Sequence, residues 1–226
     1  MRRHPVLAPS LIALALLAAG GARLALARSG NVDAVVTDEA GKPVADAVVL
    51  LTLVGAPPAA PKPAPAVMDQ VSKEFVPHVL AVVVGTSVTF PNRDNIRHHV
   101  YSFSPAKKFE LPLYIGTPAA PVVFDKAGPV ALGCNIHDWM VAHVYVVTTP
   151  HFVKTGADGK ARLEGMPAGS YEARVWHPRM RGAPEKTTKP ITLADDEPAS
   201  VAFILSLRPD SRPVQRRDPY ERQQGG

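Results

Sequence analysis

The single cysteine of this 226-residue chain is followed at regular spacing by a histidine and a methionine. Cys134, His137 and Met140 stand three residues apart, directly after Gly133. A thiolate, an imidazole and a thioether this close together form a soft ligand set, which suits a transition metal. A lone cysteine or methionine more often fills space in a hydrophobic core. The three residues together nevertheless predict a metal site in this loop.

A further ligand is available upstream, where His98 and His99 stand side by side. Two histidines, one cysteine and a weak axial methionine form the ligand set of an electron-transfer copper centre. Successive side chains of a strand point to opposite faces, so only one of the two histidines can reach the metal. The residues therefore predict a copper site built from Cys134, His137, Met140 and one of this pair.

A distant histidine followed by a tight Cys-x2-His-x2-Met loop resembles the cupredoxins, the blue copper proteins that include plastocyanin and amicyanin. The short loop is most similar to that of amicyanin, and the resemblance covers residues 67–147. It implies that His98 is the first ligand and that His99 stands where the family has an asparagine. It also implies one type 1 copper, with His98, Cys134 and His137 in a plane and Met140 as the long axial ligand.

The first residues indicate export. Arg2 and Arg3 precede an apolar run, and Ala25-Leu26-Ala27 has the small residues of a cleavage site, so residues 1–27 resemble a secretory signal peptide. Their removal takes away three arginines and no acid, which lowers the formal charge from +5 to +2. We therefore expect a periplasmic protein with no nucleic-acid partner and no membrane span after signal removal. An odd thiol in an oxidising compartment also calls for an explanation, which metal ligation supplies.

Two segments far apart in the chain resemble the halves of one transthyretin-like or carboxypeptidase-regulatory-like sandwich. They are Thr37-Asp-Glu-Ala-Gly-Lys-Pro-Val and the series from Thr155-Gly-Ala-Asp-Gly-Lys to Gly169-Ser-Tyr171. The predicted order is a signal peptide (1–27), the first part of this sandwich (28–55), a Pro/Ala linker (56–66), a cupredoxin domain (67–149), the second part (150–207) and a disordered tail (208–226). The copper domain would then be an insertion in the sandwich.

The chain holds 24 prolines, and its short β-branched runs favour strands over helices. The predicted fold class is all-β: a cupredoxin Greek-key β-sandwich plus a second small Ig/transthyretin-like β-sandwich. Within it we expect one strand over 68–75, a loop over 102–117 and hairpins over 122–132 and 152–163.

The leading interpretation is a single-electron carrier between periplasmic donor and acceptor proteins, with His137 as the electron port that the resemblance implies and with no catalytic residues. Copper storage or delivery is an alternative, and so is a carbohydrate- or surface-binding structural module with an incidental metal. Sequences of this type also resemble exported proteins grouped under methylamine utilisation. A second metal site from His78, His143 and His177 is left open, and Trp176-His177 is expected to pack against the inserted domain.

Overall fold

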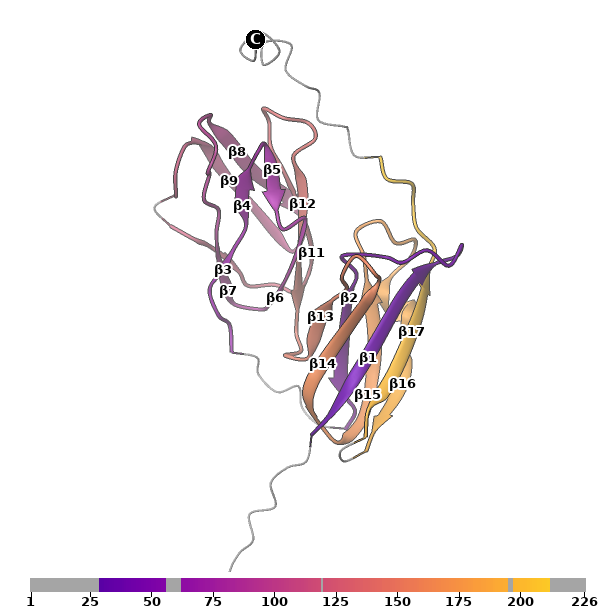
Figure 1. The fold of residues 1–226 in the computed structure, drawn as a ribbon. Helices are drawn as coiled ribbons and strands as arrows, with labels where there is room; N and C mark the ends of the chain where they lie inside the picture. Colours follow the sequence, from indigo (N-terminus) through magenta and orange to yellow (C-terminus); the bar gives the residue numbers. More distant parts are fainter. Residues whose placement is uncertain (1–28, 56–61, 119, 195–196, 212–226) are drawn as a thin grey trace, which may run out of the picture.

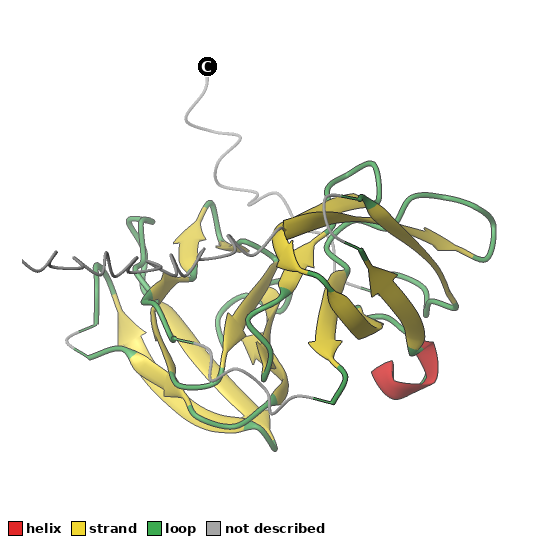
Figure 2. Cartoon of the chain, turned by 90° about the horizontal axis from the view of Figure 1, so that it is seen from below, coloured by secondary structure: helices red, strands yellow, loops and turns green. Residues whose placement is uncertain are grey.

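The computed structural model describes residues 29–55, 62–118, 120–194 and 197–211. Apart from one short 3-10 helix, drawn red in Figure 2, their regular structure is β-strand, which confirms the predicted all-β class. The predicted signal peptide, most of the predicted linker and most of the predicted tail lie outside the described residues. No helix in the described part of the chain is long and apolar enough to cross a membrane.

Strands from the two ends of the described chain form what we call the terminal sandwich (Figure 1). In one sheet, β1 (Ser29–Asp38) pairs antiparallel with β14 (Lys160–Pro167) and parallel with β17 (Ala199–Leu205). The other sheet is antiparallel, with the order β13 (Phe152–Lys154), β2 (Val48–Leu53), β15 (Gly169–Trp176) and β16 (Lys189–Leu193). The 3-10 helix η1 (Pro184–Thr187) precedes β16.

The strands between these segments form the central sandwich. Its larger sheet has the order β6 (Val79–Val83), β12 (Val141–Val147), β11 (Gly128–Gly133), β8 (His98–Ser104) and β9 (Lys107–Tyr114). A smaller sheet has the order β10 (Val122–Phe124), β7 (Thr86–Thr89) and β3 (Ala66–Val67). A hairpin of β4 (Asp69–Val71) and β5 (Glu74–Val76) lies beside them. The domain boundaries drawn from the sequence stay a prediction.

Each sandwich has its own hydrophobic core between its sheets. In the central sandwich, Val88 and Phe124 of the smaller sheet meet Val130 and Val144 of the larger one. In β12 the inward residues alternate with half-buried outward ones, as expected for a strand with one face on a core. The run Val48–Leu51 of β2 is buried without alternation, because this strand is covered on both faces.

The two sandwiches pack on each other through the outward faces of β6 and β12. The ring of Tyr145 stacks on that of Trp176, with centroids 4.3 Å apart and an interplanar angle of 9°. Val83 and Val147 pack with Leu50 of β2 at the same interface. Trp176 therefore contacts the central sandwich, as the sequence predicts.

His177, next in the chain, lies at this interface and is 6% exposed. Burial lowers its pKa to about 4, and the positive charge of Arg179 acts in the same direction. His78 adds a smaller lowering, while Asp46 and Asp210 raise the pKa. The imidazole is therefore neutral in the folded protein over most of the pH range in which an unfolded histidine is charged.

This difference predicts an acid-induced loss of stability. Above pH 6.5 neither the folded nor the unfolded His177 carries the extra proton, so the free energy of unfolding does not depend on this group. Between pH 6.5 and about 4 only the unfolded state takes it up, which should lower the free energy of unfolding by about 3 kcal/mol. Urea unfolding of the metal-free protein across this range should show that loss, and His177→Gln should flatten it. An equal pH slope in both proteins would contradict the assignment.

Four local predictions were wrong. Residues 68–75 do not form one strand but the β4–β5 hairpin, which turns at Ser72 and Lys73. The expected loop over 102–117 contains strand β9, an edge strand in which Pro112 is tolerated. The expected hairpins over 122–132 and 152–163 are absent, because β10 and β11 join different sheets, as do β13 and β14.

Candidate metal centre

The loop between β11 and β12 is closed by its own backbone. Met140 N–H donates to the carbonyl of His137 (3.0 Å), and Val141 N–H donates to that of Trp139 (2.9 Å). The two bonds make a tight turn between Cys134 at the end of β11 and Val141 at the start of β12. A turn held in this way fixes His137 relative to Met140.

Gly133 allows a close approach beside the cysteine. It pairs with Tyr101 of β8, and a Cβ on Gly133 would lie 2.7 Å from the ring of that tyrosine. Only a residue without a side chain lets the ring lie on the backbone here. The glycine thus permits the packing of β8, which begins with His98, on β11, which ends directly before Cys134.

His98, Cys134 and His137 come together in the folded chain. One donor atom of each lies within 4.8 Å of the others, and the three side chains are buried, with exposed fractions of 0%, 4% and 8%. The two imidazole rings have centroids 5.0 Å apart. Met140 is 1% exposed and belongs to the same hydrophobic core cluster as Cys134. The structure therefore gathers the three strongest predicted ligands and buries the fourth, Met140, in the same hydrophobic core as Cys134.

In both histidines Nδ1 is buried and has no hydrogen-bond partner within the described part of the chain. Nε2 of His98 bonds to the Asp94 carboxylate (2.7 Å), so Nε2 carries the proton and Nδ1 holds the lone pair. Among the described residues, four buried side-chain atoms have no hydrogen-bond partner: Nδ1 of His98, His137 and His99, and Oε1 of Gln70. Only the Nδ1 atoms of His98 and His137 belong to residues of the converging group. Such buried, unpartnered acceptors are costly unless something binds them. Two imidazole nitrogens and a buried sulfur suit a soft, thiophilic metal ion such as copper.

His99 points away from this group, as strand alternation predicts. Its Nε2 bonds to the carboxylate of Glu110 on β9 (2.8 Å), and its ring lies 5.6 Å from that of Tyr101. Of the adjacent pair, His98 is therefore the histidine that the structure places with Cys134 and His137.

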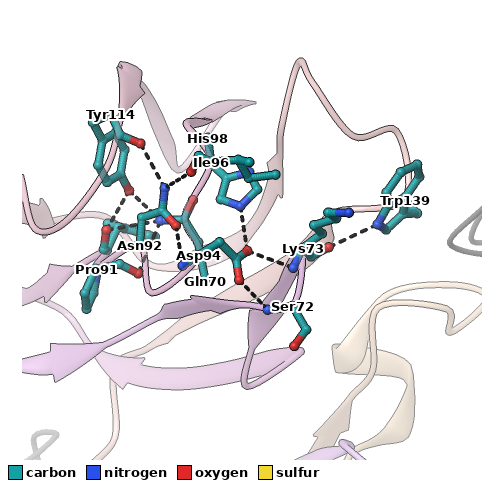
Figure 3. A network of polar contacts seen from close by, with 11 residues as sticks. Gln70, Ser72, Lys73, Pro91, Asn92, Asp94, Ile96, His98, Tyr114 and Trp139 are labelled. Carbon is teal, nitrogen blue, oxygen red and sulfur yellow. Dashed lines mark hydrogen bonds and ion pairs between the residues drawn. The ribbon is translucent and has the colours of Figure 1, made fainter. Parts of the chain in front are cut away.

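Asp94 connects His98 to the β4–β5 hairpin (Figure 3). Its carboxylate accepts the backbone N–H groups of Ser72 (2.7 Å) and Lys73 (2.8 Å) as well as the proton on His98. Burial alone would raise the pKa of Asp94, but these hydrogen bonds outweigh it and the pKa is lowered. A carboxylate on the second nitrogen of a ligating histidine fixes the tautomer and the ring orientation.

The same hairpin reaches the other histidine. The indole N–H of Trp139 donates to the backbone carbonyl of Lys73 (3.1 Å; Figure 3). The ring centroids of Trp139 and His137 are 5.0 Å apart. Burial lowers the pKa of His137, and the charges of His98 and Lys73 lower it further, although Asp94 opposes them. A neutral imidazole is the form that binds a metal.

Asn92 holds the loop that carries Asp94. Its side-chain amide donates to the carbonyls of Ile96 (2.8 Å) and Tyr114 (2.9 Å), and its oxygen accepts the N–H of Asp94 (3.0 Å). The sequence analysis did not single out Asn92 or Asp94. Their only signal is a polar cluster four to six residues before His98, which also fits an ordinary turn.

We predict that Asp94→Ala weakens Cu(II) binding by about 10- to 100-fold, because it removes the group that orients His98. Competition with a chromophoric chelator at neutral pH measures the change. Asp125→Ala is the matched control, since Asp125 pairs with Lys107 in the same sandwich and should leave affinity unchanged. Equal affinities for wild type and Asp94→Ala would contradict the role of Asp94.

In the part of the chain that the structure describes, His78, His143 and His177 do not converge as a set of three metal ligands. Within the described residues, His98, Cys134 and His137 are the one set of three or more potential ligands that converge. His78 and His143 face each other edge-on, with ring centroids 5.6 Å apart, and Nδ1 of His78 donates to the carbonyl of Val141 (3.0 Å). These histidines lie at the packing interface between the sandwiches.

No protein-family model and no curated protein matches the chain. Among solved structures, it is similar to a purple cupredoxin from Nitrosopumilus maritimus, with 26% identity, 36% of this chain and 99% of that chain covered, and a TM-score of 0.32. It is similar to a reduced Cu(I) form of amicyanin, with 25% identity and a TM-score of 0.34. This match covers 43% of this chain and 98% of the amicyanin chain. It is also similar to a copper-containing nitrite reductase from Thermus scotoductus, with 28% identity and a TM-score of 0.35. This match covers half of this chain and 28% of the nitrite reductase chain. With TM-scores below 0.5, this similarity identifies no family for the chain, and the function proposed below is based on the site itself.

Proposed function

We propose that this protein is a periplasmic type 1 copper protein that carries single electrons between exported redox partners. The observation that supports this most directly is the buried group of His98, Cys134 and His137, with one donor atom of each within 4.8 Å. The unpartnered Nδ1 atoms of the two histidines add to it. A copper ion bound there supplies a one-electron redox couple.

The residues of the chain have separate roles in this proposal. Cys134 provides the thiolate, His98 and His137 provide neutral imidazoles, and Met140 is the weak axial ligand. Asp94 and the closed turn after Cys134 hold these side chains in place. Ligands that do not move when the charge of the site changes allow rapid electron exchange, because little reorganisation accompanies each transfer.

The electron port of the proposal is His137. It is the most exposed of the three converging side chains, and its neighbour Ile136 is 51% exposed. The half-buried ring of Trp139 lies beside it. An apolar rim of this kind suits brief docking of a redox partner, since it can be desolvated at little cost.

Burial of all three converging side chains favours an electron carrier over an enzyme. A catalytic metal site keeps a coordination position open for substrate, whereas this group is enclosed by core residues. We therefore assign no catalytic residue. Copper storage or delivery uses the same ligands and is the alternative that an experiment must separate. A carbohydrate- or surface-binding module would not require His98, Cys134 and His137 to converge.

Repeated redox cycling in the presence of a Cu(I) chelator distinguishes carrier from delivery protein. We expect the copper-loaded protein to lose its visible absorption on reduction with ascorbate and to recover it on oxidation with ferricyanide, cycle after cycle. Retention of the copper during these cycles supports an electron carrier. Stoichiometric transfer of the ion to the chelator on the first reduction would instead indicate copper delivery.

A further inference from the structure

A half-open cavity of about 630 Å³ lies between the two sandwiches, on the side of β12 that faces the terminal sandwich. Its apolar walls include Val44 and Leu207 of the terminal sandwich and Val141 of the central one. This volume lies in the range of small-molecule sites, which occur preferentially between domains. The cavity is separate from the candidate metal centre, because none of His98, Cys134 and His137 lines it.

A neutral histidine presents a donor to this cavity. Nδ1 of His177 accepts the backbone N–H of Arg179 (3.2 Å), so the ring proton is on Nε2. Among the described residues, the Nε2–H of His177 has no hydrogen-bond acceptor. Nε2 is nevertheless accessible to solvent, since it is absent from the set of buried nitrogens without a partner. His177 is buried and lines the cavity, and Nε2–H is the donor that its ring can offer to a bound molecule.

Three cationic side chains line the same cavity: Lys42, Arg179 and Arg208. Within the described part of the chain none of them forms an ion pair with a carboxylate. The two arginines are instead positioned by backbone carbonyls: Arg179 donates to the carbonyl of Arg208 (3.1 Å), and Arg208 donates to that of Pro178 (3.0 Å). Their guanidinium groups keep further N–H donors for another partner.

The acidic residues of the lining are already engaged. Asp46 pairs with Lys154, which lies outside the lining (2.6 Å), and Asp38 accepts the backbone N–H groups of Ala40 (2.9 Å) and Lys42 (2.8 Å). Asp210 is exposed and has an interaction partner of its own. Three carboxylates therefore stand in the lining beside the three cations, and the N–H donors that remain for a bound molecule are those of Lys42, Arg179, Arg208 and His177.

We propose that this cavity binds a small molecule carrying a carboxylate or phosphate group, with Arg179 and the Nε2–H of His177 as its main contacts. Arginine suits such oxyanions because its planar fork donates two parallel hydrogen bonds. The apolar walls leave room for a short hydrocarbon body. This binding site is independent of the electron-transfer function proposed above, and it depends on both sandwiches.

Calorimetric titration of the intact copper-loaded protein at neutral pH and fixed ionic strength tests the proposal, with succinate, inorganic phosphate and the uncharged succinamide as probes. We expect saturable 1:1 binding of at least one of the two anions and none of succinamide. A response to succinate alone or to phosphate alone identifies which oxyanion the site takes. Arg179→Gln should weaken that binding about tenfold or more, because a charge-assisted hydrogen bond is lost.

Arg162→Gln is the matched control, because Arg162 is an arginine of the terminal sandwich outside the cavity, paired with Asp33. It should leave the affinity unchanged. Lys42→Gln provides a second test that does not touch the fold, since Lys42 is exposed, and it should also weaken binding. Absence of binding for both anions, equal binding of succinamide, or equal weakening by Arg162→Gln would each overturn the proposal.

Discussion

Replacement of Cys134 by serine should abolish the intense visible absorption that the proposed type 1 copper site predicts for the copper-loaded protein. That absorption arises from charge transfer between a thiolate and Cu(II), and the serine hydroxyl is of similar size but does not supply a thiolate. Cys134 is 4% exposed and lies within 4.8 Å of the imidazole donors of His98 and His137, so no other sulfur ligand of equal strength is at hand among the described residues. The visible spectrum of the variant after addition of one equivalent of Cu(II) measures the effect.

Met140→Leu is the informative control for this experiment. Met140 is buried, and leucine has a similar volume, so the fold should tolerate the change. If the thioether is only a weak axial ligand, the variant should keep the absorption band and have a higher reduction potential. Persistence of the band in Cys134→Ser would contradict the assignment of the cysteine, and an unchanged potential in Met140→Leu would contradict that of the methionine.

Trp176→Ala should lower the free energy of unfolding by about 3–5 kcal/mol, the largest stability effect we expect from a single side chain. Trp176 is 5% exposed, belongs to the core of the terminal sandwich and stacks on Tyr145 of the central sandwich. The substitution therefore opens a cavity and removes an aromatic contact between the two sandwiches. Urea unfolding followed by circular dichroism measures the loss.

Phe103→Ala is the matched control, because Phe103 is an aromatic residue of β8 that is 75% exposed. It should change the free energy of unfolding by no more than about 0.5 kcal/mol. A loss of similar size in both variants would show that the stacking of Trp176 has no special weight. A second unfolding transition in Trp176→Ala alone would show that the two sandwiches have lost their coupling.

The converging residues could be predicted from the sequence because most of the information is local. Cys134, His137 and Met140 lie within seven residues, and such a short loop between two strands cannot carry them far apart. His98 could be chosen over His99 because strand alternation separates neighbouring side chains and the family resemblance favours the first of them. In the structure His98 lies with Cys134, and His99 bonds to Glu110 instead.

The residues that support this group could not be predicted. Asp94 is fixed by the backbone N–H groups of Ser72 and Lys73, both in the left-handed region with φ of 55° and 61°. Neither residue type marks such a turn, which glycine or asparagine usually occupies. The contact also joins segments more than 20 residues apart, so it exists only once the hairpin has packed on the loop.

The fold class was predictable for similar reasons, while the pairing of strands was not. Runs such as Val141–Val147 alternate clearly and indicate strands. Closeness along the chain does not decide which strands pair, since β10 and β11 follow each other closely and still belong to different sheets. Strand β9 was missed because Pro112 interrupts its pattern, although Phe109 and Leu111 alternate with the exposed Lys108 and Glu110.

The most direct test of the central claim is to record the electron paramagnetic resonance and visible absorption spectra of the protein loaded with one equivalent of Cu(II). A type 1 site predicts an intense blue or green thiolate band together with compressed copper hyperfine splitting. A pale solution with ordinary hyperfine splitting would mean that Cys134 is not a ligand. In that case the buried group of His98, Cys134 and His137 would not be an electron-transfer centre.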